Sequence, residues 1–277
     1  MGMAAVVAVA LAGGGSSQSP LQRVQSAPDV TEATGSARVS ITTEVQGHGP
    51  GTRPPPPTTA IGTFSFASAG GSMQLALPPG ALVSGPVALV VDHSRFFIRL
   101  PAATASPLGS RPWLAVEPID QPELSTTSLG PVGLVQSLSP ALMLAELRGV
   151  TGAPKVIGTP GAPAGISDYR VAVNLARAEG LASGPERQSL HQLRSELGLV
   201  VIHGEVRLDS AGRVVLWTLG FELSHVLPNL ALGTEVVTVR FSDFGTDESF
   251  SVPPSTQVTE FASVQGSPAL APSGGGG

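Results

Sequence analysis

Three consecutive segments near the C-terminus alternate apolar and polar residues, and this pattern constrains the fold more than any other feature of the chain. The segments are Leu199–Leu208, Val214–Ser224 and Glu235–Phe244. Successive side chains of a β-strand point to opposite faces, so strict alternation predicts strands with one buried face. The short polar turn Asp209–Gly212 predicts that the first two strands are antiparallel neighbours. We therefore expect a sheet with one apolar face, which other elements must cover.

The alternation also assigns individual residues to the buried face. In the first segment these are Val200, Ile202, Val206 and Leu208. In the middle segment they are the odd-numbered residues Val215, Trp217, Leu219, Phe221 and Leu223. In the third segment they are Val237, Val239 and Phe241. Thr218 and Glu222 belong to the opposite face and are predicted to stay unburied.

Short apolar segments separated by turn residues continue this pattern through the rest of the chain. The upstream strand candidates are Ala37–Val45, Ile61–Ala67, Met73–Leu77, Val87–Val91, Phe96–Leu100 and Arg111–Val116. Two more precede the C-terminal segments, Val156–Gly158 and Tyr169–Leu175. Closely spaced strands with turns between them predict an antiparallel meander.

Helix signals occur at three places. A short helix is predicted to start at Ser19-Pro20, and another spans Pro185–Leu197 after a Ser183–Glu186 capping box. The central helix lies between Ser139 and Gly149 and carries four apolar residues on nearly all its sides, Leu142, Met143, Leu144 and Leu147. Such a helix is expected to lie between two apolar surfaces, or between a sheet and a cavity.

Composition excludes several classes of function. The net charge is −5, and Lys155 is the only lysine among 15 Lys and Arg residues, so no basic block predicts nucleic-acid binding. The chain contains no Cys, which excludes disulfides, thiolate zinc sites and thiol nucleophiles. Charged residues make up 13%, about half of average usage. Mean hydropathy is +0.25, although no segment is as long as a membrane span.

The two ends of the chain differ from its middle, which gives three regions. Residues 1–18 contain the apolar run Met3–Ala12 and resemble a signal peptide, although the positively charged start is absent. Leu11–Gly14 resembles a lipobox in which Gly14 occupies the position of the lipid-bearing Cys, so lipid anchoring there is doubtful. Residues 19–262 are predicted to form one domain, and residues 263–277 a disordered Gly-, Pro- and Ser-containing tail.

Motifs of catalysis and metal binding are missing from the sequence. The five histidines lack the spacing of a metal site, and neither Gly-x-Ser-x-Gly nor Ser-x-x-Lys occurs. The chain is therefore predicted to be no enzyme and to need no cofactor.

A set of segments in a fixed order resembles a known family. The segments are Thr63–Phe66, Arg95–Pro101, Arg111–Val116, the central helix, Ser167–Val171, Val206–Val214 and Phe241–Gly245. Together they resemble actinobacterial lipoproteins of the LppX/LprG type and relatives with a LolA-like fold. The resemblance implies an α+β fold, in which helices cover the concave face of a strongly curved antiparallel half-barrel.

The resemblance also implies a function. It predicts an exported protein of the cell envelope that carries lipid or acylated glycolipid in an apolar cavity, peripheral to the membrane and monomeric. The expected cavity lining is Leu142, Leu144, Leu147, Val171, Val173, Val215, Trp217, Leu219 and Phe221. The alternative is that helix and sheet pack tightly without a cavity, which would make the chain a non-catalytic structural or interaction domain of the envelope.

Overall fold

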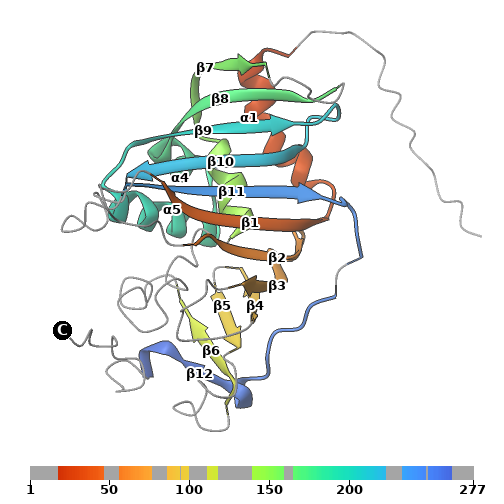
Figure 1. Ribbon diagram of the computed structural model, residues 1–277, viewed down its shortest axis with the longest axis vertical. Coiled ribbons are helices and arrows are strands. Elements are labelled where there is room, and N and C mark those ends of the chain that lie inside the picture. Colours follow the sequence, from red (N-terminus) through yellow and green to blue (C-terminus); the bar gives the residue numbers. More distant parts are fainter. Residues whose placement is uncertain are drawn as a thin grey trace, which may run out of the picture.

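The computed structural model describes residues 18–46, 56–76, 86–93, 95–99, 111–117, 139–158, 165–222, 233–247 and 249–263. These residues form one 12-stranded sheet and four α-helices (Figure 1). Neighbouring strands are antiparallel, apart from the parallel pair of β12 and β6 at one edge. The sheet is open, with β12 and β7 as its two outermost strands. The predicted α+β class with a mostly antiparallel sheet is therefore confirmed.

The strands follow one another in the sheet largely in the order of the chain. From one edge they are β12 (Val258–Glu260), β6 (Trp113–Val116), β5 (Arg95–Arg99), β4 (Val87–Asp92), β3 (Gly70–Ala76) and β2 (Thr58–Ser65). Then come β1 (Ser36–Gln46), β11 (Thr234–Ser242), β10 (Val214–Glu222), β9 (Val201–Leu208), β8 (Ser167–Asn174) and β7 (Val150–Ile157). Every predicted strand is present. The three-residue β12 was not predicted.

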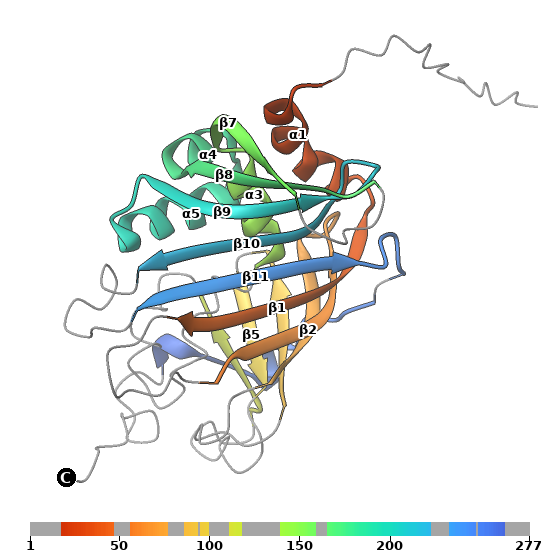
Figure 2. The same cartoon turned by 45° about the horizontal axis from the view of Figure 1, so that its top comes forward.

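The four helices are α1 (Pro20–Glu32), α3 (Pro140–Leu147), α4 (Leu175–Leu181) and α5 (Gly184–Leu197). They gather on one side of the curved sheet, by the half that contains β7 to β10 (Figure 2). The predicted start at Ser19 is confirmed, since Ser19 and Gln22 form a capping box. The predicted capping box at Ser183 is wrong, because its side chain makes no capping hydrogen bond. Leu175, assigned to a strand, instead begins α4 behind an Asn174 cap.

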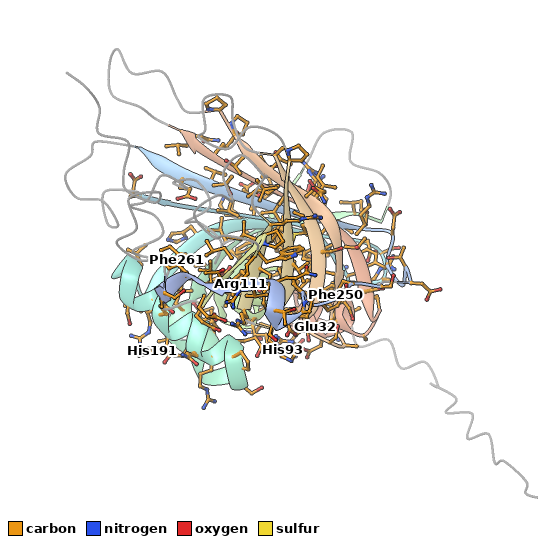
Figure 3. The ribbon with its side chains drawn as sticks, turned by 90° about the horizontal axis from the view of Figure 1, so that it is seen from below. Glu32, His93, Arg111, His191, Phe250 and Phe261 are labelled. Atoms are coloured by element: carbon orange, nitrogen blue, oxygen red, sulfur yellow. The ribbon has the colours of Figure 1, made fainter. Side chains whose placement is uncertain are left out.

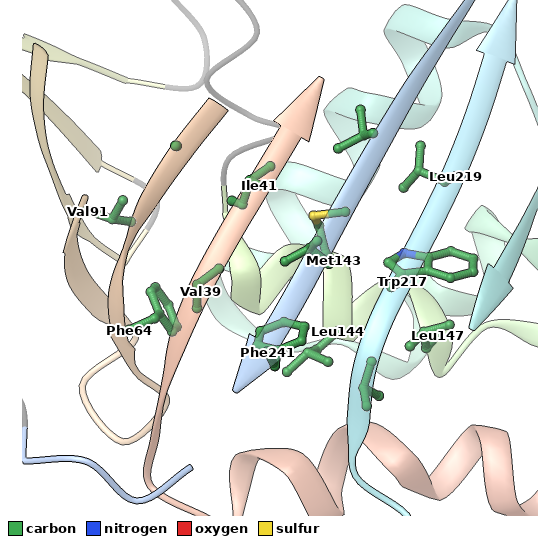
Figure 4. Packing of buried hydrophobic residues seen from close by; sticks show 14 of the residues in the cluster. Val39, Ile41, Phe64, Val91, Met143, Leu144, Leu147, Trp217, Leu219 and Phe241 are labelled. Carbon is green, nitrogen blue, oxygen red and sulfur yellow. The ribbon is translucent and has the colours of Figure 1, made fainter. Parts of the chain in front are cut away.

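The inner face of the sheet is apolar and buried, and the predicted alternation is largely confirmed there (Figure 4). The predicted residues that the structure buries are Ile202, Val206, Leu208, Trp217, Leu219, Val237, Val239 and Phe241. Thr218 is half-buried and Glu222 exposed, as predicted. In the register of the ladders, Val206, Trp217, Val239 and Ile41 lie side by side across four strands. These cross-strand contacts continue the core from the helices toward β1.

Two predicted core residues are not buried. Val215 is half-buried because a β-bulge in β10 pairs Val214 with Leu208 but Leu216 with Arg207. The extra residue shifts the parity, so Val214 is the residue that enters the core. Val200 precedes β9 and is 56% exposed. Leu223 and the side chain of Phe221 lie outside the described part of the chain.

Trp217 fits into the inner face because the neighbouring strand carries a glycine. A Cβ atom on Gly204 would lie 2.5 Å from the Trp217 ring and 2.3 Å from the Thr218 carbonyl oxygen. The missing side chain on β9 thus makes the space that the indole of β10 occupies. Trp217 is fully buried as a result.

Helix α1 is attached to the sheet at two points. The Thr31 hydroxyl donates to the Ala27 carbonyl at 2.7 Å and accepts the backbone N–H of Val214 at 2.8 Å. The Gln25 side-chain amide donates to the Val150 carbonyl at 2.8 Å. The first contact satisfies a buried N–H at the β-bulge, which the strand ladder would otherwise leave without an acceptor.

The C-terminal segment adds side chains to both faces of the β4–β6 end. Phe250 packs against a small outer cluster of Val90, Phe97, Ala115 and Val258, whereas Phe261 is buried in the main core. Both residues are labelled in Figure 3, which views the molecule from below.

Substitution of Gly204 by Ala tests the packing of Trp217. We expect Gly204→Ala to lower the free energy of unfolding by about 1–3 kcal/mol, because the new methyl group must displace backbone or indole. Gly220→Ala is the matched control, since its Cβ atom would meet nothing closer than 3.4 Å. Urea unfolding of both variants measures the difference, and equal stability losses would contradict this packing.

Candidate functional site

Helix α3 lies at the centre of the candidate site. Its start is set by Ser139, whose side chain accepts the Leu142 backbone N–H at 3.4 Å, and by Pro140 in the first turn. Seven of its eight residues are buried, so α3 lacks the broad polar face by which a surface helix contacts solvent. The sequence predicted both the position of this helix and its burial.

The helix contacts two different apolar surfaces. Met143, Leu144 and Leu147 belong to the main core and face the sheet (Figure 4). Leu142 and Ala145 form a second cluster, whose other members are Ala178, Ala182 and Leu190 of α4, the α4–α5 corner and α5. The helix is thus enclosed by the sheet on one side and by α4 and α5 on the other.

The structure brings most of the predicted cavity-lining residues together. Leu144, Leu147, Val171, Val173, Trp217 and Leu219 all lie in the main core. Leu142 lies in the second cluster, on the side of α3 that faces α4 and α5. Val215 lies in a groove on the outer face of the sheet, and the Phe221 side chain is outside the described residues. Whether the gathered residues bind a ligand stays a prediction.

One hydrogen bond crosses the interface between α3 and the sheet. The Trp217 indole Nε1–H donates to Oε2 of Glu146 at 3.1 Å, and both residues are buried. Burial raises the pKa of Glu146 from its ordinary value of 4.5 to about 8, and the hydrogen bond from Trp217 lowers it less strongly. At neutral pH the Glu146 carboxyl is therefore mostly protonated. In the described residues, this is the one side-chain hydrogen bond between α3 and a strand.

A second buried carboxyl lies on the inner face, at the beginning of β11. Glu235 is 1% exposed, and within the described chain its Oε1 has no hydrogen-bond partner. Burial raises its pKa to about 7. Glu235 shares the parity of Val237 and Val239, so alternation alone would have placed it inside. The signal for Glu146 was weaker, a single acid on an otherwise apolar helix.

Helix α3 is joined to α1 by ion pairs at its C-terminal end. The Arg148 guanidinium lies 2.8 Å from Oδ1 of Asp29 and 2.7 Å from Oε2 of Glu32. Asp29 is largely exposed, so solvent screening reduces the contribution of its ion pair to stability. Glu32 is about one-third exposed, so its pair is screened less. These contacts orient the two helices relative to each other.

A cleft of about 310 Å³ opens beside α3. Its lining residues come from α1, α3, the β2–β3 turn and the α4–α5 corner: Glu32, Phe66, Ala69, Ala141, Ala145, Arg148, Leu181, Ala182, Ser183 and Glu186. The Phe66 ring also contacts the interior, with its centroid 5.6 Å from that of Phe64 and 6.1 Å from that of Phe241. Phe66 therefore contacts both the cleft and the main core.

Within the described residues, no three His, Asp or Glu residues lie together in a way that could hold a metal ion. None of the helices described is both long and apolar enough to span a membrane.

Glu146→Gln is expected to change how stability depends on pH. Between pH 4.5 and about 8 the folded state holds a proton on Glu146 that the unfolded state releases, so stability falls as pH rises. The limiting slope is about 1.4 kcal/mol per pH unit. Gln keeps an acceptor for Trp217 but does not titrate, so the variant should lose this slope and gain stability at pH 8 relative to wild type.

The residual slope of this variant should come from Glu235, whose contribution is lost as pH rises toward about 7. Glu146→Gln/Glu235→Gln is the control for that contribution. Denaturant unfolding across the pH range gives all three curves. Identical slopes for wild type and Glu146→Gln would contradict a protonated, buried Glu146.

Comparisons with known proteins give similarity to solved structures alone. No protein-family model matches the sequence and no curated protein matches it, so the resemblance to LppX/LprG-type lipoproteins stays a prediction. Among solved structures, the fold is similar to a LolA superfamily protein from Nitrosomonas europaea, at 8% sequence identity and a TM-score of 0.32. The match covers 84% of this chain and 96% of that chain. Agreement at this level assigns neither family nor function.

Proposed function

We propose that this protein is an exported, non-catalytic carrier that binds the acyl chains of a lipid or acylated glycolipid between α3 and the inner face of the sheet. The binding domain would comprise residues 19–262, act as a monomer and stay peripheral to the membrane. The observation that carries the proposal is the position of α3. It is a short helix, enclosed by apolar surfaces and joined to the sheet by one side-chain hydrogen bond.

The attachment of α3 contrasts with that of α1. Helix α1 is held by side-chain bonds to backbone groups of β10 and β7, whereas α3 meets the strands through apolar contacts and Glu146. Apolar contacts are non-directional, so an acyl chain can replace Met143, Leu144 and Leu147 against the sheet. Displacement of α3 leaves the buried Trp217 N–H without its Glu146 acceptor, which costs about 1–3 kcal/mol. For α3 to move aside, this hydrogen bond and the ion pairs of Arg148 with α1 must open.

The cleft beside α3 provides a route for the ligand. One part of its wall is Phe66, which contacts Phe64 and Phe241 of the core. Rotation of this one partly buried ring would connect the cleft with the interior. The polar end of the ligand would stay in the cleft, in contact with the charged residues Glu32, Arg148 and Glu186.

The energy available from acyl-chain burial is sufficient for such a rearrangement. Each buried CH₂ group contributes about 0.8 kcal/mol, so a chain of about twelve carbons contributes on the order of 10 kcal/mol. Association itself and the displacement of α3 reduce this gain. A net favourable value requires a long aliphatic chain, which is why a lipid is proposed and a small metabolite is not.

A structural or interaction domain is the second candidate. Leu144 and Leu147 are each 0% exposed and share one cluster with residues of the sheet. This close contact favours a helix that simply completes the core. The two candidates differ in whether the contact between α3 and the sheet can be replaced by a ligand.

The lipid content of the wild-type protein, compared with that of two variants, distinguishes the carrier from the structural domain. We expect wild-type protein, purified from an actinobacterial host, to release lipid on solvent extraction and to carry it in native mass spectrometry. Leu144→Trp should overpack the side of α3 that faces the sheet, cost about 1–3 kcal/mol of stability and reduce the bound lipid. Leu142→Trp is the matched control, because it overpacks the opposite side of the same helix.

We expect bound lipid in wild type and in Leu142→Trp, and a loss of bound lipid in Leu144→Trp. Absence of lipid from wild type, together with failure to take up added phospholipid or long-chain fatty acid, would establish the structural candidate instead. Equal loss of lipid in both variants would move the binding site away from the interface between α3 and the sheet.

A further inference from the structure

The outer face of the sheet carries a groove that the interior site does not use. It has a volume of about 330 Å³ and lies over β1, β2, β9, β10 and β11. Its lining includes three arginines, Arg38, Arg207 and Arg240. Between them lie the apolar side chains of Ile61, Val215 and Leu216, of which Ile61 is 47% exposed. Cations around an exposed apolar floor form an amphipathic surface.

The register of the ladders brings these residues together from distant parts of the chain. Arg207, Leu216, Arg240, Ser40 and Ile61 occupy one line across five adjacent strands. Arg38 faces Ser242, while Arg240 faces Ser40, so the two arginines are diagonal neighbours on adjacent strands. Diagonal Cα atoms lie about 7–8 Å apart, within reach of long side chains. The β-bulge at Val215 adds an apolar side chain beside them.

The three arginines differ in their partners. Arg207 makes a bidentate pair with Asp168, at 2.6 Å and 3.1 Å. Arg38 and Arg240 are exposed, and among the described residues neither has an acidic partner. Like charges on neighbouring strands repel each other and destabilise a sheet. A bound anion would relieve this repulsion, and the hydroxyl groups of Ser40 and Ser242 add donors at the same place.

We propose that this groove is a membrane-docking site, in which Arg38 and Arg240 bind the phosphate groups of anionic phospholipids while Ile61, Val215 and Leu216 contact the interfacial carbon atoms. A soluble phosphate ion would satisfy the guanidinium groups but leave the apolar floor exposed to water. A phospholipid surface complements both. The net charge of −5 makes general attraction to an anionic membrane unfavourable, so binding must depend on this local pair of cations.

The docking site goes beyond acyl-chain binding and does not depend on it. The groove and the core residues Leu144 and Trp217 lie on opposite faces of the sheet. A carrier with such a groove would present its outer face to the membrane. Vesicle binding and lipid content therefore report on separate surfaces of the molecule.

Flotation with vesicles tests the docking site. Wild-type protein should bind vesicles of phosphatidylglycerol mixed with phosphatidylcholine, and not vesicles of phosphatidylcholine alone. Each arginine near an anionic surface strengthens binding about fivefold, so Arg38→Gln/Arg240→Gln should weaken it about 25-fold. Arg99→Gln/Arg177→Gln is the matched control, since it removes two exposed arginines outside the groove and changes net charge equally.

The control should retain at least half of the wild-type affinity. Equal losses in the two double variants would overturn the proposal, because binding would then follow net charge alone. Absence of wild-type binding to the anionic vesicles would also overturn it.

Inorganic phosphate is the remaining probe. Thermal stabilisation by phosphate that needs Arg38 and Arg240, without vesicle binding, would show a small-anion site and exclude membrane docking.

Discussion

The indole of Trp217 lies where the sheet and α3 meet, and its burial requires specific residues on two other elements. Gly204 leaves room for the ring on the neighbouring strand, and Glu146 accepts its N–H from α3. A buried Trp needs such an acceptor, because an unpaired N–H costs about 1–3 kcal/mol. The acceptor is a carboxyl whose pKa burial raises to about 8, so it can stay neutral in the apolar interior. The hydrogen bond thus holds α3 to the sheet, while burial keeps the Glu146 carboxyl neutral.

The two faces of the sheet perform different physical tasks. The inner face joins α1, α3 and α4 to strands from both ends of the chain through one continuous apolar core. The outer face carries polar ladders, among them Thr218 and Thr238, whose hydroxyl oxygens lie 3.2 Å apart. Since only 13% of the residues are charged, the unpaired Arg38 and Arg240 stand out on that face. An apolar interior for acyl chains and a cationic groove for phosphate would serve the same amphipathic partners.

The sequence predicted those features that depend on local periodicity. Alternation located β9, β10 and β11, and Ser139, Pro140 and the apolar run located α3. It failed at Val215, because three successive apolar residues, Val214 to Leu216, do not reveal where a bulge shifts the parity. It also missed β12, a three-residue strand whose pairing with β6 depends on contacts about 145 residues apart in the chain. The outer groove was unpredictable for the same reason, since Arg38 and Arg240 meet only through the register of β1 and β11.

An acyl chain that takes the place of α3 against the inner face would lie beside Trp217, whose fluorescence reports on it directly. The chain has two tryptophans, so Trp113→Phe leaves Trp217 as the sole indole fluorophore. Titration of this variant with a long-chain fatty acid brominated along its tail places a contact quencher wherever the acyl chain binds. We expect saturable quenching of Trp217, with no quenching by the unbrominated acid. Unchanged Trp217 fluorescence, under conditions in which mass spectrometry finds the brominated acid bound, would contradict it.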